Sequence, residues 1–209
     1  MKNYKNLFVI ILLFGFIYTQ QNIGGQPFSK DNKVKLDIDR VVMESFNIQS
    51  MIEEDQLKKS GKMRYGKVFD TNISAHDKGT WEINEDGSVL WRLLITSPEA
   101  YALSLSFLDF YIPEGGILYA YSPNYSEING GYTSENNSDH FSTPLITGDT
   151  IILEYYNDIG FNDIPSINII EVIHDYKDLF NSIMNRDECG TNVVCSVADP
   201  YEDEINAVA

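Results

Sequence analysis

The sequence is poor in the residues that most often carry chemistry. Its 209 residues include only two cysteines and three histidines. Two cysteines are too few for a small fold stapled by several disulfides. The sequence also lacks the H-E-x-x-H pattern of zinc peptidases, the G-x-S-x-G pattern of α/β-hydrolases and the phosphate-binding P-loop. These absences argue against a zinc peptidase, an α/β-hydrolase and a nucleotide-dependent enzyme.

Basic residues are scarce as well. The chain has 15 lysines and arginines against 31 aspartates and glutamates, which gives a formal net charge of −16. The acidic residues are spread along the chain rather than gathered in one tail. Such a surface repels phosphate groups, so we expect neither nucleic acid nor an anionic membrane among the partners.

Only one long apolar run occurs, and it lies at the start of the chain. Lys2 and Lys5 precede it, and it extends from Leu7 to Ile17. A helix needs about 20 apolar residues to span a bilayer, and a charged start before a shorter run is typical of a secretory signal peptide. We therefore expect residues 1–20 to be a signal peptide. The mature product is expected to be extracellular, with no membrane segment after signal removal.

The main pattern that is present is strict alternation of apolar and polar residues after Gly79. The apolar positions of two such runs are Val89, Trp91, Leu93 and Ile95, and then Leu103, Leu105 and Phe107. Glycine, proline, asparagine and aspartate separate roughly six to eight short runs of this kind, which is typical of an antiparallel sandwich. No stretch between them is long enough for the crossover helices of a parallel sheet. We predict an all-β fold, an antiparallel β-sandwich or jelly roll over residues 68–178.

Residues 21–67 are polar and mixed, and we predict an arm with one short helix. Ser50 and Glu53 have the spacing of a capping box, and acidic residues fill the turn that follows Ser50. Gly61 supplies a stop signal. We interpret this segment as a surface helix rather than a chemical site.

Candidate catalytic and metal-binding residues are weak. His76, His140 and His174 each have an aspartate as sequence neighbour, but neighbours in extended chain point to opposite faces. Adjacency therefore does not create a catalytic dyad, and we assign no catalytic residue to this chain. Acidic pairs such as Asp37 with Asp39 do not fit the spaced ligands of a calcium loop. We expect no metal and no cofactor.

The two tryptophans, Trp81 and Trp91, allow two interpretations. They could form a stacking platform for sugars, as in carbohydrate-binding sandwiches. Both, however, fall in register with the aliphatic residues of their strands, which favours the core. An exported β-sandwich binding module for carbohydrate or for a cell-surface protein is therefore an alternative function.

The end of the chain carries both cysteines. Cys189 and Cys195 are spaced C-x5-C, which is too wide for a redox motif, and no further cysteine or histidine is close enough to complete a zinc site. A local disulfide between them is geometrically feasible. The residues that follow begin an alternating apolar stretch with Ile205 and Val208 and end at Ala209. Because domains seldom end at the first residues of a strand, this tail is typical of the opening of a second domain.

The tail C-G-T-N-V-V-C-S-V-A-D-P-Y-E-D-E-I-N-A-V-A, residues 189–209, resembles the start of the catalytic domain of secreted bacterial trypsin-like serine endopeptidases of the lysyl endopeptidase type. Residues 79–123, 143–156 and 167–178 are similar to successive segments of the pro-region of the same peptidases. The resemblance implies that residues 187–209 are the start of a trypsin-like protease domain and include the first strand of its double β-barrel. It also implies that Cys189 and Cys195 bond to cysteines beyond Ala209, where the catalytic histidine, aspartate and serine would lie.

This resemblance implies a function for the whole protein. The chain would be the pro-region fragment of a secreted serine endopeptidase, a zymogen, with residues 179–186 connecting the β-sandwich pro-domain to the protease domain. Its partner would be its own downstream protease domain, which would hydrolyse proteins or peptides, with lysine specificity as an expectation. We predict processing after Arg186, the basic residue nearest the tail, with Lys177 as the weaker candidate if the enzyme is strictly lysine-directed.

Overall fold

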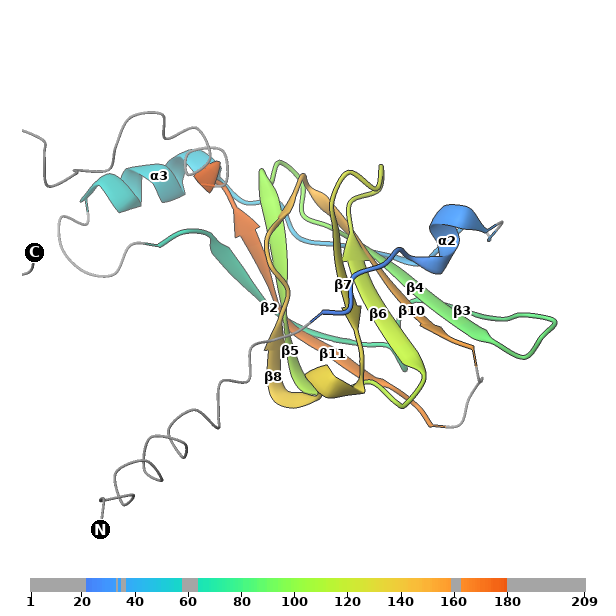
Figure 1. The fold of residues 1–209 in the computed structure, drawn as a ribbon. Helices are drawn as coiled ribbons and strands as arrows, with labels where there is room; N and C mark the ends of the chain where they lie inside the picture. Colours follow the sequence, from blue (N-terminus) through green and yellow to red (C-terminus); the bar gives the residue numbers. More distant parts are fainter. Residues whose placement is uncertain (1–21, 33, 35–36, 58–63, 159–162, 180–209) are drawn as a thin grey trace, which may run out of the picture.

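The computed structural model describes residues 22–32, 34, 37–57, 64–158 and 163–179 (Figure 1). The predicted signal peptide, most of the predicted connection, and the predicted start of the protease domain, with its barrel strand, lie outside the described residues. Within the described residues, no helix has the length and apolarity that crossing a membrane requires.

Two β-sheets make up the body of the protein, with short helical segments outside them (Figure 1). Sheet A contains β1 (Arg40–Val42), β3 (Thr80–Ile83), β4 (Val89–Thr96), β6 (Gly116–Tyr121), β7 (Ile128–Tyr132) and β10 (Thr150–Asn157). Sheet B contains β2 (Lys67–Ser74), β5 (Ala102–Tyr111), β8 (Ser138–Ser142), β9 (Ile146–Thr147) and β11 (Ser166–Asp175). The helical segments are α2 (Phe28–Asp31), α3 (Ile48–Leu57) and η1 (Ser134–Asn136). The predicted all-β sandwich with a short helical arm is confirmed.

The order of the strands is that of a jelly roll. Sheet A runs β4-β10-β6-β7 and sheet B runs β2-β11-β5-β8. The antiparallel pairs are nested along the chain: β2 pairs with β11, β4 with β10, β5 with β8 and β6 with β7. One long hairpin rolled into a sandwich produces this nesting, and it brings the first and last main strands of the fold together.

One edge of sheet A departs from the antiparallel pattern. The short strand β1 lies parallel to the second half of β4, with Arg40 opposite Leu94 and Val42 opposite Thr96. Strand β3 pairs with the first half of the same edge in the antiparallel sense. Residues from the predicted arm therefore extend the sheet, and they cover an edge that would otherwise expose unpaired backbone groups.

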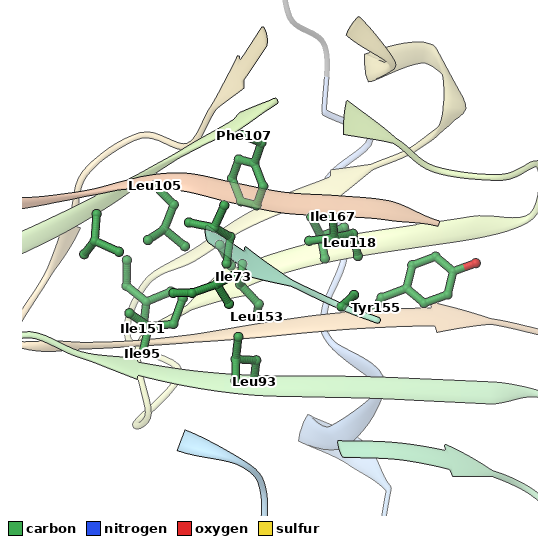
Figure 2. Close-up of a cluster of buried hydrophobic side chains, with 14 of the residues drawn as sticks. Ile73, Leu93, Ile95, Leu105, Phe107, Leu118, Ile151, Leu153, Tyr155 and Ile167 are labelled. Carbon is green, nitrogen blue, oxygen red and sulfur yellow. The ribbon is translucent and has the colours of Figure 1, made fainter. Parts of the chain in front are cut away.

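The core lies between the two sheets, and the alternating residues fill it as predicted. The inward residues of β4, β5 and β10 are at most 1% exposed; they are Val89, Trp91, Leu93, Ile95, Leu103, Leu105, Phe107, Ile151, Leu153 and Tyr155. Figure 2 shows several of them meeting between the sheets. Burying one such aliphatic side chain stabilises a fold by about 1.5–3 kcal/mol, so this layer is the main source of stability.

Trp91 belongs to this core and Trp81 packs against it, so the two do not form an exposed sugar platform. Trp91 is 0% exposed, and its indole nitrogen donates to the Lys78 carbonyl over 2.9 Å. Trp81 is half-buried against the core, with its ring centroid 6.0 Å from that of Tyr155. Gly79 has a φ of +94°, and a Cβ there would lie 2.1 Å from the Trp91 indole nitrogen. Only glycine therefore fits beside Trp91 at this turn.

Helix α3 begins earlier than the capping box predicted. The Asn47 side-chain oxygen accepts a hydrogen bond from the backbone nitrogen of Ser50 over 3.0 Å, and the helix starts at Ile48. The prediction that Ser50 caps the helix is therefore wrong. Asparagine at this position caps a helix as well as serine does, so the local signal was ambiguous. None of the residues of α3 is buried, and Figure 1 shows the helix standing at one end of the sandwich.

Candidate functional site

The chain leaves the sandwich beside α3, directly after β11. Four residues meet there, and we call them the exit cluster: Asp55 of α3, with Arg64, Tyr176 and Lys177. Tyr176 donates its hydroxyl to Asp55 Oδ2 over 2.5 Å, and Lys177 Nζ lies 2.7 Å from the same oxygen. Arg64 Nε donates to Asp55 Oδ1 over 3.0 Å. The cluster thus ties α3 to the last residues of the sandwich.

The electrostatics of the exit cluster favour a charged Asp55. Hydrogen bonds from Lys177, Tyr176 and Arg64 hold the pKa of the Asp55 carboxyl well below its usual range, against a smaller opposing effect of desolvation. Burial, together with the hydrogen bond to Asp55, raises the pKa of Tyr176 to about 12. At neutral pH the tyrosine therefore stays protonated, and its hydroxyl donates a hydrogen bond to an ionised carboxylate.

Lys177 is the one predicted processing residue among the described residues, and both its side chain and its backbone are engaged. Its Nζ donates to the Arg64 carbonyl over 2.5 Å and lies 5.4 Å from the Tyr176 ring centroid. Asp175 accepts from the backbone nitrogens of Lys177 and Leu179 over 2.7 and 2.9 Å. A protease needs an extended, accessible segment, so this turn shields Lys177 while the sandwich is folded.

The other predicted site residues fall outside the described residues. They are Arg186, the preferred processing residue, and the two half-cystines Cys189 and Cys195. Their roles stay predictions.

His174 meets a serine hydroxyl, but the pair is sealed from solvent. Ser97 Oγ lies 2.8 Å from His174 Nδ1, while the two residues are 1% and 0% exposed. His174 Nε2 has no hydrogen-bond partner, and the neighbouring Asp175 is occupied by the backbone groups described above. Because no substrate can reach the pair, it is a structural hydrogen bond rather than a catalytic dyad. Burial lowers the pKa of His174 below its ordinary value.

A buried carboxylate on the outer face of sheet A was not apparent from the sequence. Glu154 is 0% exposed; it accepts from the backbone nitrogen of Ser29 over 3.0 Å and from the Tyr121 hydroxyl over 2.8 Å. Ser29 Oγ lies 2.9 Å from the Tyr121 hydroxyl oxygen and 3.1 Å from that of Tyr125. The only sign of this site in the sequence is a glutamate inside an apolar run. Its partner Ser29 precedes it by 125 positions, so no local pattern links the two.

Beside this cluster lies a cavity of about 720 Å³ between the segment that follows α2 and the strands β4, β6 and β10. Its polar lining includes Asn32, Asp37, Arg40, Arg92 and Tyr125. Cationic, anionic and amide groups therefore face one space. Such a mixture of hydrogen-bond donors and acceptors suits a neutral polar ligand better than an ion.

Of the acidic pair considered for calcium, Asp39 serves the backbone instead, and Asp37 lines the cavity described above. Asp39 accepts from the backbone nitrogens of Arg40 and Gly79 over 2.8 and 2.9 Å. Among the residues whose positions are described, no group of three histidines, cysteines, aspartates or glutamates is arranged to hold a metal ion.

No protein-family model matches this chain, and no solved structure matches it either.

Proposed function

We propose that this chain is the amino-terminal, pro-region part of a secreted serine endopeptidase of the lysyl endopeptidase type. Residues 68–178 form its pro-domain, and residues 187–209 begin its catalytic domain. The chain itself carries no residue of the catalytic triad, which lies beyond Ala209. The whole enzyme cleaves peptide bonds by acyl transfer, with serine as nucleophile and histidine as base.

One structural observation supports this proposal above the others: the sandwich is complete where the resemblance requires a pro-domain to end. The nested pairing closes when β11 pairs with β2, and the exit cluster fastens the chain at Tyr176 and Lys177. A pro-domain that one cut removes must be a closed fold followed by a cleavable bond. Arg186 and the C-x5-C segment follow at that point.

The proposed partner is the downstream protease domain of the same protein. A pro-domain at the amino-terminus is synthesised first and folds as a unit before the catalytic domain is complete. It is then positioned to assist folding of the enzyme or to hold it inactive until export. The substrates of the released enzyme are proteins or peptides.

The amino-terminus of the secreted mature enzyme tests this proposal. The natural gene is expressed as wild type, as Arg186→Gln and as Lys177→Gln, and the secreted products are sequenced from the amino-terminus. We expect Asp187 as the first residue of the wild-type and Lys177→Gln products, and loss of this terminus in Arg186→Gln. A mature form that retains the sandwich, or one that begins upstream of Gly160, rules the proposal out.

A binding module is the second candidate, and the cavity near Tyr125 favours it. Jelly rolls include lectins, but this analogy concerns the fold and not the site. Titration of the protein with a panel of neutral oligosaccharides separates the two functions. Binding that Asn32→Ala and Tyr125→Ala weaken supports a module, whereas the absence of binding to the whole panel leaves only the pro-region.

A further inference from the structure

One polar atom inside the sandwich has no partner. His174 is 0% exposed, and among the described residues nothing forms a hydrogen bond with its Nε2. Its other ring nitrogen, Nδ1, lies 2.8 Å from Ser97 Oγ. A buried polar atom without a hydrogen bond costs free energy, so folded proteins contain few of them and each calls for an explanation.

A half-buried side chain covers this imidazole. The Phe46 ring packs edge-on against it, with ring centroids 4.8 Å apart. Phe46 belongs to residues 43–47, which join β1 to α3 and which we call the arm link. The backbone nitrogen of Met43 fastens the start of the arm link, because it donates to the Thr96 carbonyl over 2.8 Å. Phe46 itself lies outside any helix or strand, between the imidazole and solvent.

The charges that face His174 from the surrounding elements do not compensate its burial. Burial lowers its pKa, and the carboxylates of Asp175 and Glu99 oppose this effect only in part. On β2, the residue opposite His174 is Lys67, which is itself a cation. The arm link carries one carboxylate, Glu44, and this side chain is exposed. A proton on the buried imidazole would therefore be poorly stabilised.

In the closed structure, a proton added to His174 also lacks a hydrogen-bond acceptor. A protonated imidazole donates from both ring nitrogens. Ser97 Oγ can accept from Nδ1, whereas Nε2 has no acceptor within the described part of the chain. Water supplies an acceptor only after a covering side chain moves. Phe69 and Leu103 are held in the ladders of β2 and β5, so Phe46 is the side chain that moves most easily.

We propose that Phe46 and the arm link form an acid-operated cover: when His174 takes up a proton, Phe46 moves away from it and the arm link opens. The exit cluster stays closed in mild acid, because the pKa of Asp55 lies well below the usual carboxyl range. The two sheets keep their pairing. The opening is therefore local to the end of the sandwich at which β11 ends.

This cover lies next to the turn from which the chain leaves the sandwich. Asp175 accepts from the backbone nitrogens of Lys177 and Leu179, and one peptide bond joins it to His174. Exposing the imidazole therefore moves the acceptor on which this turn depends. Mild acid would then weaken the shielding of Lys177. That role in processing rests on the proposed function, whereas the opening itself rests on the described residues alone.

Amide hydrogen exchange of the full chain at pH 7.5 and at pH 5.5 tests the cover, with each rate divided by the intrinsic rate at the same pH. The reporters are the Met43 amide of the arm link and the amides of β10. Met43 should be less protected than β10 at both pH values, because a local opening is easier than global unfolding. In the wild type its protection should fall by up to about tenfold at pH 5.5, one unit below the ordinary histidine pKa.

Two variants and two matched controls identify the groups responsible. His174→Gln binds no proton, so the protection of Met43 should not change with pH. Phe46→Ala leaves the imidazole exposed at both pH values, so protection should be low throughout and equally independent of pH. His76→Gln, at an exposed position, should behave as the wild type does. Phe28→Ala should do so too, since Phe28 stacks on Tyr156 instead.

Three results overturn the cover. In the first, the protection of Met43 in the wild type is the same at both pH values. In the second, it equals that of β10 at both, so that the arm link opens only with the whole fold. In the third, it falls equally in His174→Gln. If circular dichroism shows that His174→Gln does not fold, equal pH dependence in Phe46→Ala and Phe28→Ala overturns the cover. A mature enzyme that begins at an unexpected residue refutes the proposed function but leaves these exchange rates unchanged.

Discussion

At the scale of single residues, Trp91 and His174 show how burial assigns a role to a side chain. Each is 0% exposed, and each uses one ring nitrogen in a hydrogen bond, to the Lys78 carbonyl and to Ser97 Oγ respectively. Burial makes Trp91 a packing residue, and it makes His174 a group that resists protonation. The two roles lead to different measurable consequences.

Replacing Trp91 by alanine should lower the free energy of unfolding by about 3–5 kcal/mol, because it empties a central core position. The change also leaves the Lys78 carbonyl without its indole donor. Urea denaturation measures the loss. Ile83→Ala serves as the control and should change stability by no more than about 0.5 kcal/mol, since this side chain is 69% exposed. An unchanged melting temperature in Trp91→Ala would contradict the core assignment.

His174 should make the sandwich less stable in mild acid. Burial lowers the pKa of His174 in the folded state, against the opposing effects of Asp175 and Glu99, so the unfolded chain binds this proton more readily. Stability is therefore complete above the unfolded value of about 6.5 and falls as the pH drops below it toward the folded pKa. Ser97 Oγ and the rings of Phe46 and Phe69 pack against the imidazole, and none of them can pair with an added charge as a carboxylate would.

Urea denaturation at pH 7.5 and at pH 5.5 measures this effect. The wild type should lose stability between the two, and His174→Gln should lose less because it binds no proton. His76→Gln, at an exposed turn, should keep the pH dependence of the wild type. The prediction fails if His174→Gln shows the same loss as the wild type.

At the scale of elements, α3 depends on the exit cluster for its position. Because the pKa of Asp55 is lowered, its ion pairs persist as the pH falls through the usual carboxyl range and are lost only in strong acid. Asp55→Asn keeps the size of the side chain but removes the charge that pairs with Lys177 and Arg64. Helix α3 should then exchange its backbone amides faster, while β10 in the core stays protected.

Hydrogen exchange followed by mass spectrometry measures this difference between elements. Glu53→Gln is the matched control, since Glu53 accepts a hydrogen bond from Gln49 within the same helix and contacts no residue of the exit cluster through an ion pair. Equal exchange of α3 in the wild type and in Asp55→Asn would show that the cluster does not hold the helix.

At the scale of the whole molecule, the residues before the sandwich are part of the fold. In the segment around α2, the backbone N–H of Ser29 donates a hydrogen bond to Glu154. Phe28 stacks on Tyr156 with ring centroids 4.5 Å apart. Strand β1 then extends the edge of sheet A. A jelly roll that began at β2 would leave this face of the sheet and the Glu154 carboxylate uncovered.

Deleting residues 22–32 should therefore lower the free energy of unfolding by about 1–3 kcal/mol, because Glu154 loses a hydrogen-bond donor. The protein should remain β-rich by circular dichroism, since the core strands are unaffected. The same deletion should lower the free energy of unfolding by less in Glu154→Gln, because glutamine has no buried charge that needs hydrogen-bond donors. An equal cost in the two backgrounds would mean that the buried carboxylate does not couple to this segment.

The alternation of residues by itself determined the strands and the inward faces. Leu93, Ile95, Leu103 and Leu105 are core residues because a period of two puts every second side chain on the same face, wherever the strand lies. The predicted all-β class follows from that local rule. The start of α3 was missed because Asn47 and Ser50 are both good caps, and local sequence does not choose between them.

Only the tertiary structure decided which strands are neighbours and which polar groups meet. Nesting places β2 beside β11, so that Asp55 reaches Tyr176 across 121 positions and Glu154 reaches Ser29 across 125. Neither pair leaves a signal in a window of the sequence, because a contact between distant residues depends on the path of the whole chain between them. Burial of His174 has the same origin, since this residue lies opposite Lys67 where the two ends of the rolled hairpin come together.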